Sequence, residues 1–352
     1  MKGMLKYLSP FAPDQSGAAS VLYDMGGITV ICDAGGCTGN ICGFDEPRWT
    51  GQPRPVFSAG LRDMDAILGR DDKLVEKLGA VSSKMNASFA AIIGTPVPVV
   101  IGTDFKALVR MTEKRCGLPA VAVECTGTGL YDEGASNTYT ALLEKFAEDV
   151  SETDESAAGV LGMIPLEISR NDGKDVVHST YADSVHKNFL CYGMGNGIDD
   201  LKKAGSVAEN IVVSPSGLAA AKYLKKRFGT PYRIDYPFIP EALVEKFRQL
   251  AGKHVLVIHQ QAAASKAREI IESAGGTDVI CGSWFMQPEE MTRPGDISFT
   301  TEEQFMEYAA SGRFDVLAAD SLMERAARAA GFKGEFVEFN HFAVSGDLDD
   351  EK

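Results

Sequence analysis

Three of the seven cysteines lie in one short stretch of the chain, residues 27–49, and cysteine thiolates are the usual ligands of iron–sulfur clusters. Four residues separate Cys37 from Cys42, whereas a zinc knuckle would show a tight Cys-x-x-Cys pair. The surrounding residues are rich in glycine: Gly35, Gly36 and Gly39. Glycine permits turns with positive φ and leaves room for an inorganic group close to the main chain. The pattern predicts a flexible loop whose two thiolates bind one metal centre.

The other cysteines carry weaker signals. Cys32 ends an apolar strand and is interpreted as a small buried hydrophobe, an alternative that also stays open for the two loop cysteines. Cys125 follows a second strand, residues 120–124. Ligands of parallel sheets gather at the carboxyl ends of the strands, so we expect Cys125 on the same face as Cys37 and Cys42. The remaining thiols are interpreted as structural: Cys116, Cys191 and Cys281.

Two kinds of proton-carrying side chain accompany the cysteines. Asp33 and Asp45 border the predicted loop and are candidate oxygen ligands or proton donors, the alternative being solvated loop carboxylates. His341 is a candidate proton donor to a substrate. Because phenylalanines flank it, the alternative is a packed histidine that makes one hydrogen bond.

These residues are positioned by an alternation of strands and helices that begins with the β-branched strand 28–31. Such an alternation predicts βαβ units with parallel sheets. We expect an α/β fold of tandem Rossmann-like domains, with boundaries at 1–155, 156–252 and 253–352. Further strands are expected at 89–93, 210–214, 254–258, 278–281, 315–318 and 335–342, and helices at 16–25, 71–84, 103–115, 139–150, 217–228, 241–251, 262–274, 302–310 and 321–330.

Composition excludes several classes of function. The formal charge of −14 over 352 residues disfavours nucleic acid and anionic lipid as partners. The chain has no run of 18 apolar residues and no export signal at its start, so we expect a cytoplasmic protein that does not cross a membrane. An odd number of cysteines without a regular spacing favours reduced thiols or metal ligands over disulfides.

The order of these segments resembles component 1 of the nitrogenase family, in a shortened form. Residues 24–37 are similar to the family's helix, strand and glycine loop that ends in a cluster-ligand cysteine, which places Cys37 at that ligand. Residues 61–69 resemble the segment before the next helix, and residues 95–104 are similar to the family's "Cys-Pro … Ile-Gly-Asp-Asp" motif. Residues 223–231 and 338–346 resemble the helix before "Gly-Ile-Pro" and the terminal histidine motif.

The chain also departs from this family's pattern at several ligand positions. Ser9 and Pro10 stand in the region of the first cluster cysteine, and Thr95 stands at the third. The cysteine that anchors the large molybdenum cofactor falls near Ser214, and the histidine ligand falls at Asn340 or His341. The resemblance therefore does not imply dinitrogen reduction on that cofactor.

The resemblance implies an iron–sulfur cluster, a 4Fe-4S cubane or larger, between two identical or paralogous subunits. Three thiolates per chain would supply 2 × 3 = 6 ligands, and two per chain would supply 2 × 2 = 4. The implied function is an oxidoreductase subunit that receives electrons from an ATP-dependent iron protein and reduces an unidentified substrate in a cleft between domains. Two alternatives stay open: a non-catalytic scaffold or carrier for a metal cluster or tetrapyrrole, and a purely structural subunit.

Overall fold

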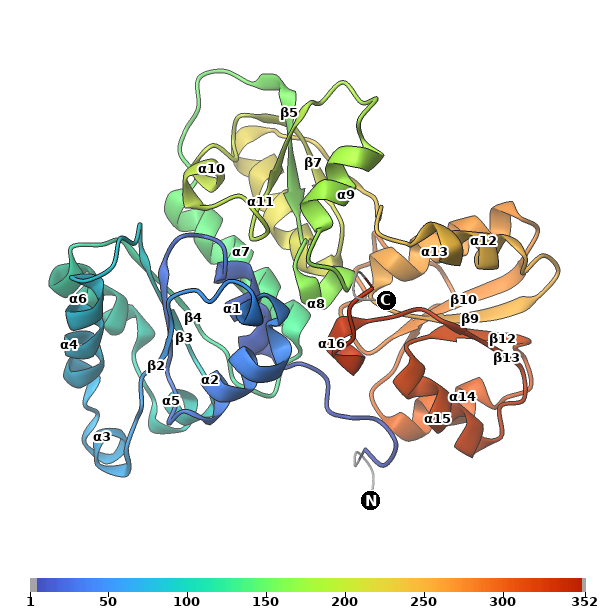
Figure 1. Ribbon diagram of the computed structural model, residues 1–352, viewed down its shortest axis with the longest axis horizontal. Helices are drawn as coiled ribbons and strands as arrows, with labels where there is room; N and C mark the ends of the chain where they lie inside the picture. The colour runs from blue at the N-terminus through green and yellow to red at the C-terminus, as the bar shows by residue number, and fades with distance from the viewer. Residues whose placement is uncertain (1–4, 350–352) are drawn as a thin grey trace.

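The computed structural model describes residues 5–349, which form three parallel sheets with helices packed on them (Figure 1). Every neighbouring pair of strands in each sheet runs parallel. Parallel strands need crossover connections, and helices supply them here as the alternating pattern predicts. The α/β class with parallel sheets is therefore confirmed. The expected domain boundaries stay a prediction.

The first sheet has the strand order β2-β1-β3-β4 and holds the cysteine segment. Its central strands β1 and β3 are buried throughout and apolar except for Thr29, as expected for strands covered on both faces. Its strands are β1 (Ile28–Ile31), β2 (Val56–Ser58), β3 (Ala90–Ile93) and β4 (Ala120–Val123). Its helices are α1 (Asp14–Leu22), α2 (Gly36–Asn40), α3 (Asp63–Leu68), α4 (Asp71–Ser82), α5 (Pro96–Ile101), α6 (Phe105–Cys116) and α7 (Tyr131–Phe146), with a π-helical turn at Ile41–Asp45 and a 3₁₀ turn at Pro47–Thr50.

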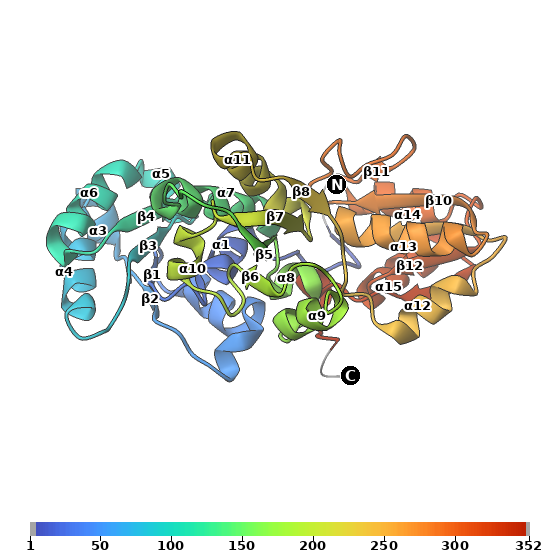
Figure 2. The same ribbon diagram turned by 90° about the horizontal axis from the view of Figure 1, so that it is seen from above.

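The second and third sheets have the orders β6-β5-β7-β8 and β11-β10-β9-β12-β13. The second unit contains β5 (Asp154–Leu161), α8 (Pro165–Ile168), α9 (Gly173–Thr180), β6 (Asn188–Cys191), α10 (Ile198–Lys202), β7 (Val207–Val212), a 3₁₀ turn (Pro215–Gly217), α11 (Leu218–Phe228) and β8 (Tyr232–Ile234). The third contains α12 (Glu241–Arg248), β9 (His254–Ile258), α13 (Gln261–Ser273), β10 (Thr277–Ser283), β11 (Ile297–Ser298), α14 (Glu302–Ala309), β12 (Val316–Ala319), α15 (Ser321–Ala330), β13 (Glu335–Glu338) and α16 (Phe342–Ser345). Seen from above, the units follow one another along the long axis (Figure 2).

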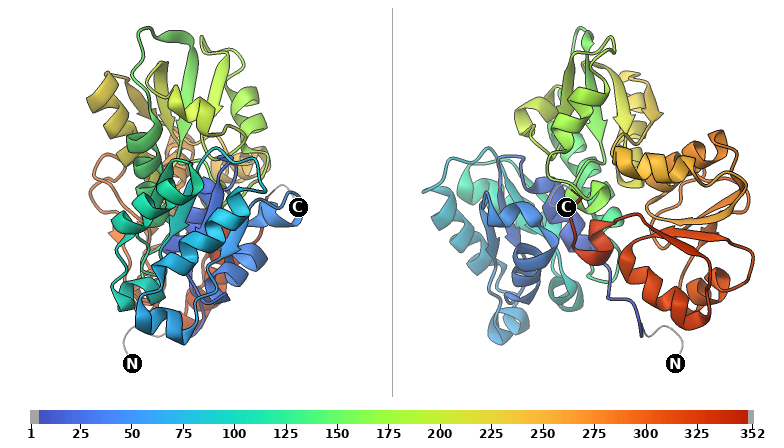
Figure 3. Two further views of the ribbon diagram at one scale, coloured as in Figure 1. Left: turned by 90° about the vertical axis from the view of Figure 1, so that its left-hand side faces the viewer. Right: turned by 45° about the vertical axis from the view of Figure 1, so that its right-hand side comes forward.

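Helices α1 and α7 cross at the centre of the molecule with almost no space between their backbones. A Cβ atom on Gly17 would lie 1.8 Å from the Tyr131 carbonyl oxygen, and one on Gly134 would lie 1.8 Å from the Asp14 carbonyl oxygen. Only glycine fits at these two positions. The close contact brings the start of α7 beside α1, and α16 lies at the same centre, in contact with α8 (Figure 3).

Several element boundaries differ from the sequence-based expectation, and α7 and β13 show clear shifts. Helix α7 begins at Tyr131 and not at residue 139, because the tight packing on α1 overrides the weak helix propensity of residues 134–138. The last strand ends at Glu338, before residue 342, and His341 then precedes the short helix α16. The sequence also gave no signal for several short elements: β6, β8, β11, α8 and α9.

Candidate functional site

The cysteine segment is helical, so the expected flexible loop is wrong. After β1 the chain turns at Gly35, whose φ is 123°, and α2 begins at Gly36. Cys37 lies in α2, and Cys42 lies in the π-helical turn that continues it. The first turn of a helix leaves backbone N–H groups without intrahelical partners. One of them, the N–H of Thr38, donates to the Asp33 carboxylate at 2.8 Å, which helps explain why a helix forms here.

Asp33 acts mainly as the anchor of this helix. Its carboxylate also accepts hydrogen bonds from the Thr38 hydroxyl at 3.0 Å and from the Ser58 hydroxyl at 2.6 Å. The residue is buried, so its interpretation as a solvated loop carboxylate is wrong. A catalytic role for Asp33 stays a prediction. In such a role the carboxylate would have to act while it accepts these three hydrogen bonds.

The thiols of the segment differ in their access to solvent. Cys37 and Cys42 are half-buried, whereas Cys32 and Cys125 are buried. Burial raises the pKa of Cys37, and the Asp33 charge raises it further. Burial also raises the pKa of Cys42, together with the charges of Glu46 and Asp33. Both side chains are therefore protonated thiols at neutral pH until a cation binds them.

Cys125 does not join the other two cysteines in one site. It follows β4, but only 1% of it is exposed, and burial together with Asp14 raises its pKa. Within residues 5–349, no group of three His, Cys, Asp or Glu side chains is arranged to hold a metal ion. One chain thus offers the half-exposed pair Cys37 and Cys42, a donor set that fits a cluster completed by a second chain. Cys125 as a ligand stays a prediction.

The glycines of the segment leave open space beside the thiols. A Cβ atom on Gly36 or Gly39 would meet no atom within 4 Å, and one on Gly35 would only approach the Ser58 hydroxyl at 4.0 Å. This space faces outward from the chain. It is compatible with an inorganic group or a second protein chain against α2, and the expected role of these glycines in cofactor binding stays a prediction.

Arg48 fixes the chain that follows the cysteines. Its guanidinium donates to both Glu46 carboxylate oxygens at 2.7 Å and to Asp24 at 3.1 Å. It also donates to the carbonyl oxygens of Ser20 in α1 and Gly193 in the second unit, both at 2.7 Å. These bonds tie the end of the cysteine segment to the centre of the molecule, a role that no sequence motif indicated.

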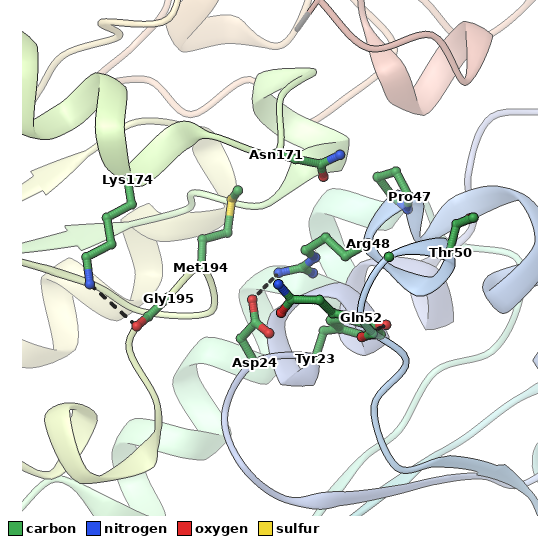
Figure 4. A pocket seen from close by; sticks show the side chains of 11 residues that line it. Tyr23, Asp24, Pro47, Arg48, Thr50, Gln52, Asn171, Lys174, Met194 and Gly195 are labelled. Atoms are coloured by element: carbon green, nitrogen blue, oxygen red, sulfur yellow. Dashed lines mark hydrogen bonds and ion pairs between the residues drawn. The ribbon is translucent and has the colours of Figure 1, made fainter. Parts of the chain in front are cut away.

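A cavity of about 450 Å³ lies beside Arg48, between the first and second units (Figure 4). Lys174 faces it from the second unit and donates a long hydrogen bond, 3.5 Å, to the Gly195 carbonyl oxygen. Because the donors of Arg48 are already engaged, Arg48 forms part of the wall of this cavity and does not add a free charge.

A larger cavity, about 790 Å³, lies on the other side of the cysteine segment. The π-helical turn contributes Phe44 and Asp45 to its wall, and α16 contributes Phe342. Burial raises the pKa of Asp45, although hydrogen bonds from Ser16 and Asn40 lower it. No sequence motif indicated that residues 9–13 and 342–346 complete this wall.

His341 lies inside the molecule, at the meeting point of the three units. Its Nε2 atom is 2.9 Å from the Tyr131 hydroxyl, which is also 2.9 Å from Oε2 of Glu167. The imidazole ring stacks on that of His259, with ring centres 4.2 Å apart. Burial and the neighbouring His259 hold the pKa of His341 well below its usual value, so the ring is neutral. The geometry agrees with a packed histidine, and its catalytic role stays a prediction.

Glu167 completes this buried row and was missed by the sequence analysis. Burial and the charge of Asp132 raise its pKa to about 8, against the lowering effect of the Ser216, Tyr131 and Ser214 hydroxyls. Ser214 itself donates to the Gly162 carbonyl oxygen at 2.8 Å. Glu167 and Tyr131 thus lie between Ser214 and His341. The resemblance assigns a cofactor ligand near Ser214 and another at Asn340 or His341, and both assignments stay predictions.

An exposed apolar patch lies at the same edge of the first sheet as the cysteines. Helices α2, α3 and α5 follow the carboxyl ends of β1, β2 and β3, so all three lie at one edge (Figure 1). The patch on α3 and α5, called the apolar patch below, consists of Met64, Ile67, Leu68, Val99, Val100 and Ile101. Val100 is 84% exposed and Ile67 is 75% exposed. Such contiguous apolar surface marks interaction sites.

Comparisons with known proteins agree with this architecture. The model of the family described as nitrogenase component 1 type oxidoreductase matches residues 15–274. A nitrogenase iron-molybdenum cofactor biosynthesis protein of Clostridium pasteurianum is 26% identical over 191 residues, 51% of this chain and 39% of that protein. A component of the Ni-sirohydrochlorin a,c-diamide reductive cyclase complex of Methanothermobacter thermautotrophicus is 30% identical over 122 residues, 34% of this chain and 33% of that protein. The matches therefore span well under half of either relative.

Solved structures share the fold over nearly the whole chain. A nitrogenase structure described as Cp1 at pH 6.5 superposes with a TM-score of 0.74 at 12% identity, covering 98% of this chain and 88% of that one. The same protein at pH 5 gives a TM-score of 0.71 at 15% identity, covering 99% and 86%. In the part of the chain that the structure describes, no helix has the length and apolar character needed to span a membrane.

Proposed function

Because the chain belongs to the nitrogenase component 1 type oxidoreductase family, we propose that it is the cluster-binding subunit of a nitrogenase-like reductase. It receives electrons from an ATP-dependent iron protein and passes them to a substrate bound beside the cysteine segment. One observation carries the proposal: the half-buried pair Cys37 and Cys42 lies on one short helical segment, which lines a cavity of about 790 Å³ and shares its sheet edge with an exposed apolar patch.

The cluster is shared between two chains. Cys37 and Cys42 from each chain give 2 × 2 = 4 thiolates, the number that a 4Fe-4S cubane requires. When bound, the cluster supplies the electron storage that the side chains lack. The chain positions the thiols through Asp33 and Arg48, and its carboxylates raise their pKa values. Iron must therefore displace protons, so that cluster binding weakens as the pH falls.

The apolar patch is the docking site of the iron protein in this proposal. Leu68 and Val100 lie on adjacent short helices at the cysteine edge of the sheet. Burying these side chains against a partner would stabilise the complex by about 25 cal/mol for each Å² of apolar surface. A donor that docks there lies close to α2, which keeps the path of electron transfer short.

The substrate occupies the cavity beside the π-helical turn. Phe44 and Phe342 provide aromatic walls for a large ligand, and Asp45 is the acidic group on that wall. Asp45 lies in this wall, and burial raises the pKa of its carboxyl group, which makes it the proposed proton donor of the site. The cyclase named above acts on a nickel sirohydrochlorin, and a molecule of that kind, large and flat, suits such a cavity.

A second candidate function is a scaffold or carrier for a metal cluster or tetrapyrrole. Two observations favour it: one relative is a cofactor biosynthesis protein, and the interior position that the resemblance assigns to the family cofactor is filled here by Glu167 and Tyr131. A carrier would hold its cargo at the outer cavity and release it, so that it would need no electron donor.

Iron analysis after anaerobic reconstitution tests the shared cluster. We expect Cys37→Ala and Cys42→Ala each to lose most of the iron and sulfide that the wild-type protein binds. Cys116→Ala is the matched control, because Cys116 is also half-buried but lies at the far end of α6. If Cys125→Ala retains its iron, the cluster has four thiolate ligands from the two chains. If this variant loses iron, the cluster has six. Wild-type iron content in Cys37→Ala would exclude this cluster.

Single-turnover reduction distinguishes the two candidate functions. A reduced iron protein with ATP should change the visible spectrum of the cluster in a reductase. A carrier would bind the cluster or tetrapyrrole and transfer it to an acceptor protein, with no change on addition of the iron protein. The measurement uses the same anaerobic preparation as the iron analysis.

A further inference from the structure

Residues 5–13, called the strap below, cross without a helix or strand from the third unit to the first (Figure 1). At its outer end the backbone N–H groups of Lys6, Tyr7 and Leu8 all donate to the carboxylate of Glu302, at 2.8, 2.8 and 2.7 Å. At its inner end the Ala12 N–H donates to the Ala343 carbonyl oxygen at 3.2 Å. Hydrogen bonds to a charged acceptor are the stronger kind, so Glu302 acts as a latch for this segment.

The middle of the strap is held by one side chain. Among the described residues, no backbone hydrogen bond involves residues 9–11, and Pro10 has no N–H to donate. The ring of Phe11 packs against Trp284 and Phe285, with ring centres 5.4 Å apart in both pairs. The strap is therefore attached by the Glu302 latch, the Leu8 side chain buried in the core, the Phe11 ring and its inner end.

The strap separates two cavities. On one side lies the cavity of about 790 Å³ beside the cysteine segment, and on the other a cavity of about 520 Å³. Pro10, Phe11 and Pro13 line both of them. Aromatic rings form much of the remaining apolar wall: Phe44 and Phe342 in the first cavity, Trp284 and Phe299 in the second.

Phe11 also covers the buried row of polar residues. Directly beneath it Phe285 packs against Tyr131 at 5.1 Å and against His341 at 4.8 Å between ring centres. Movement of the strap would join the two cavities and remove one of the layers that separate His341 from solvent. Phe285 still lies between His341 and the opened cavity, so the opening brings a bound molecule closer to the row without direct contact.

We propose that the strap is a latched cover, and that the cavities on its two sides become one binding site for a bulky, planar ligand when the latch opens. The aromatic side chains of both walls favour a planar ligand, and Ser9, Asn40 and Asp45 offer polar partners at its edge. This inference rests on the proposed function only in sharing its substrate cavity, because the opening of the strap can be measured without iron or an electron donor.

Glu302→Gln tests the latch, since the amide keeps the shape of the side chain but removes the charge. Glu303→Gln is the control: Glu303 is the next residue of α14 and is exposed. Because three charge-assisted hydrogen bonds weaken together, we expect amide hydrogen exchange at residues 6–8 to accelerate by about tenfold or more in Glu302→Gln. The control should exchange like the wild type.

Ligand binding must change by the same factor as exchange. If only the open form binds, the apparent Kd is inversely proportional to the open fraction, which amide exchange also reports. The probe is Nile red, a neutral planar dye, titrated into the full-length protein. In a Trp49→Phe background, Trp284 is the only tryptophan left and its fluorescence reports the loss of the Phe11 contact.

Unchanged exchange at residues 6–8 in Glu302→Gln overturns the latch. Faster exchange without tighter Nile red binding overturns the shared binding site. Phe11→Leu provides a second route if Glu302→Gln does not fold, because it removes the aromatic anchor and leaves the latch intact; it should raise exchange and dye affinity together. These tests need no iron. If exchange and dye binding change as expected while the protein binds no iron, the strap inference holds and the proposed function fails.

Discussion

Nε2 of His341 lies 2.9 Å from the hydroxyl of Tyr131, although 210 positions separate the two residues in the sequence. The same hydroxyl is 2.9 Å from Glu167 and carries a single proton, so one of its two neighbours must donate to it. The hydroxyl donates to Oε2 of Glu167, so Nε2 of His341 donates to the hydroxyl in turn. Because the pKa of Glu167 is raised to about 8, the row carries no net charge at neutral pH. Oε1 of Glu167 and Nδ1 of His341 have no hydrogen-bond partner among the described residues.

Removal of the Tyr131 hydroxyl should destabilise the protein. Tyr131→Phe leaves buried polar atoms of Glu167 and His341 without a partner, which typically costs about 1–3 kcal/mol in the free energy of unfolding. The control is Tyr223→Phe, whose hydroxyl accepts only from the exposed Arg227. Urea unfolding monitored by circular dichroism measures both. Equal stability of the two variants would contradict the proton arrangement described here.

Glu167 should make stability depend on pH. Its pKa in the folded protein, about 8, lies above its value in the unfolded chain, about 4.3. The stabilisation from the protonated form is therefore complete below about pH 4.3 and is lost as the pH rises to about 8. Relative to Glu167→Gln, the wild type should lose up to about 1.4 kcal/mol per pH unit in this window.

Urea unfolding at several pH values from 5 to 9 measures this difference. Glu155→Gln, an exposed substitution in the second unit, controls for the loss of one carboxyl group. If the curves for wild type and Glu167→Gln run parallel across the whole range, Glu167 is not protonated in the folded protein.

The crossing of α1 and α7 should not tolerate a methyl group. Gly17→Ala places a Cβ atom 1.8 Å from the Tyr131 carbonyl oxygen, so the helices must move apart at a cost of about 3 kcal/mol or more. Gly36→Ala meets open space and should leave the stability nearly unchanged. Thermal unfolding of both variants provides the comparison, and a Gly17→Ala protein as stable as Gly36→Ala would refute the close contact.

The regular elements could be predicted from the sequence because their signals are local. Strand β1 matches its predicted range, 28–31, since four β-branched residues in a row indicate a buried strand. The helical form of the cysteine segment could not be predicted, because it depends on Asp33 reaching forward to Thr38 and across to Ser58. The row of Tyr131, Glu167 and His341 has no local pattern either, because its members come from three separate helices or helix starts.

The cysteine site could be predicted only in part from the sequence, because its arrangement also depends on contacts between distant residues. The motif identified Cys37 and its spacing to Cys42, and the structure places both on one half-exposed segment. The expectation that Cys125 faces the same site relied on strand ends alone. Strand ends fix the edge of the sheet but not the depth of a side chain, and Cys125 lies in the interior.

The apolar patch gives a prediction about the electron donor. In the proposed function an iron protein docks on α3 and α5, so Val100→Asp introduces a charge into a contact that excludes water. Such a change at the centre of an interface typically costs about 2 kcal/mol or more, equivalent to a roughly 30-fold weaker complex. Val185→Asp is the matched control, because Val185 is 80% exposed but lies in the second unit, away from the cysteines. Both variants should keep their fold and their iron, since neither side chain supports the core.

The measurement is the rate of cluster reduction at limiting concentrations of ATP-loaded iron protein under anaerobic conditions. We expect the Val100→Asp rate to fall by roughly the loss in affinity and to recover at high iron protein concentration, because the substitution affects association and not the electron transfer step. The ADP-loaded iron protein, or nicotinamide nucleotides alone, should not reduce the cluster in any variant. Equal rates for Val100→Asp and Val185→Asp would show that the donor docks elsewhere, and the exposed residues of α3 and α5 would then require a different partner.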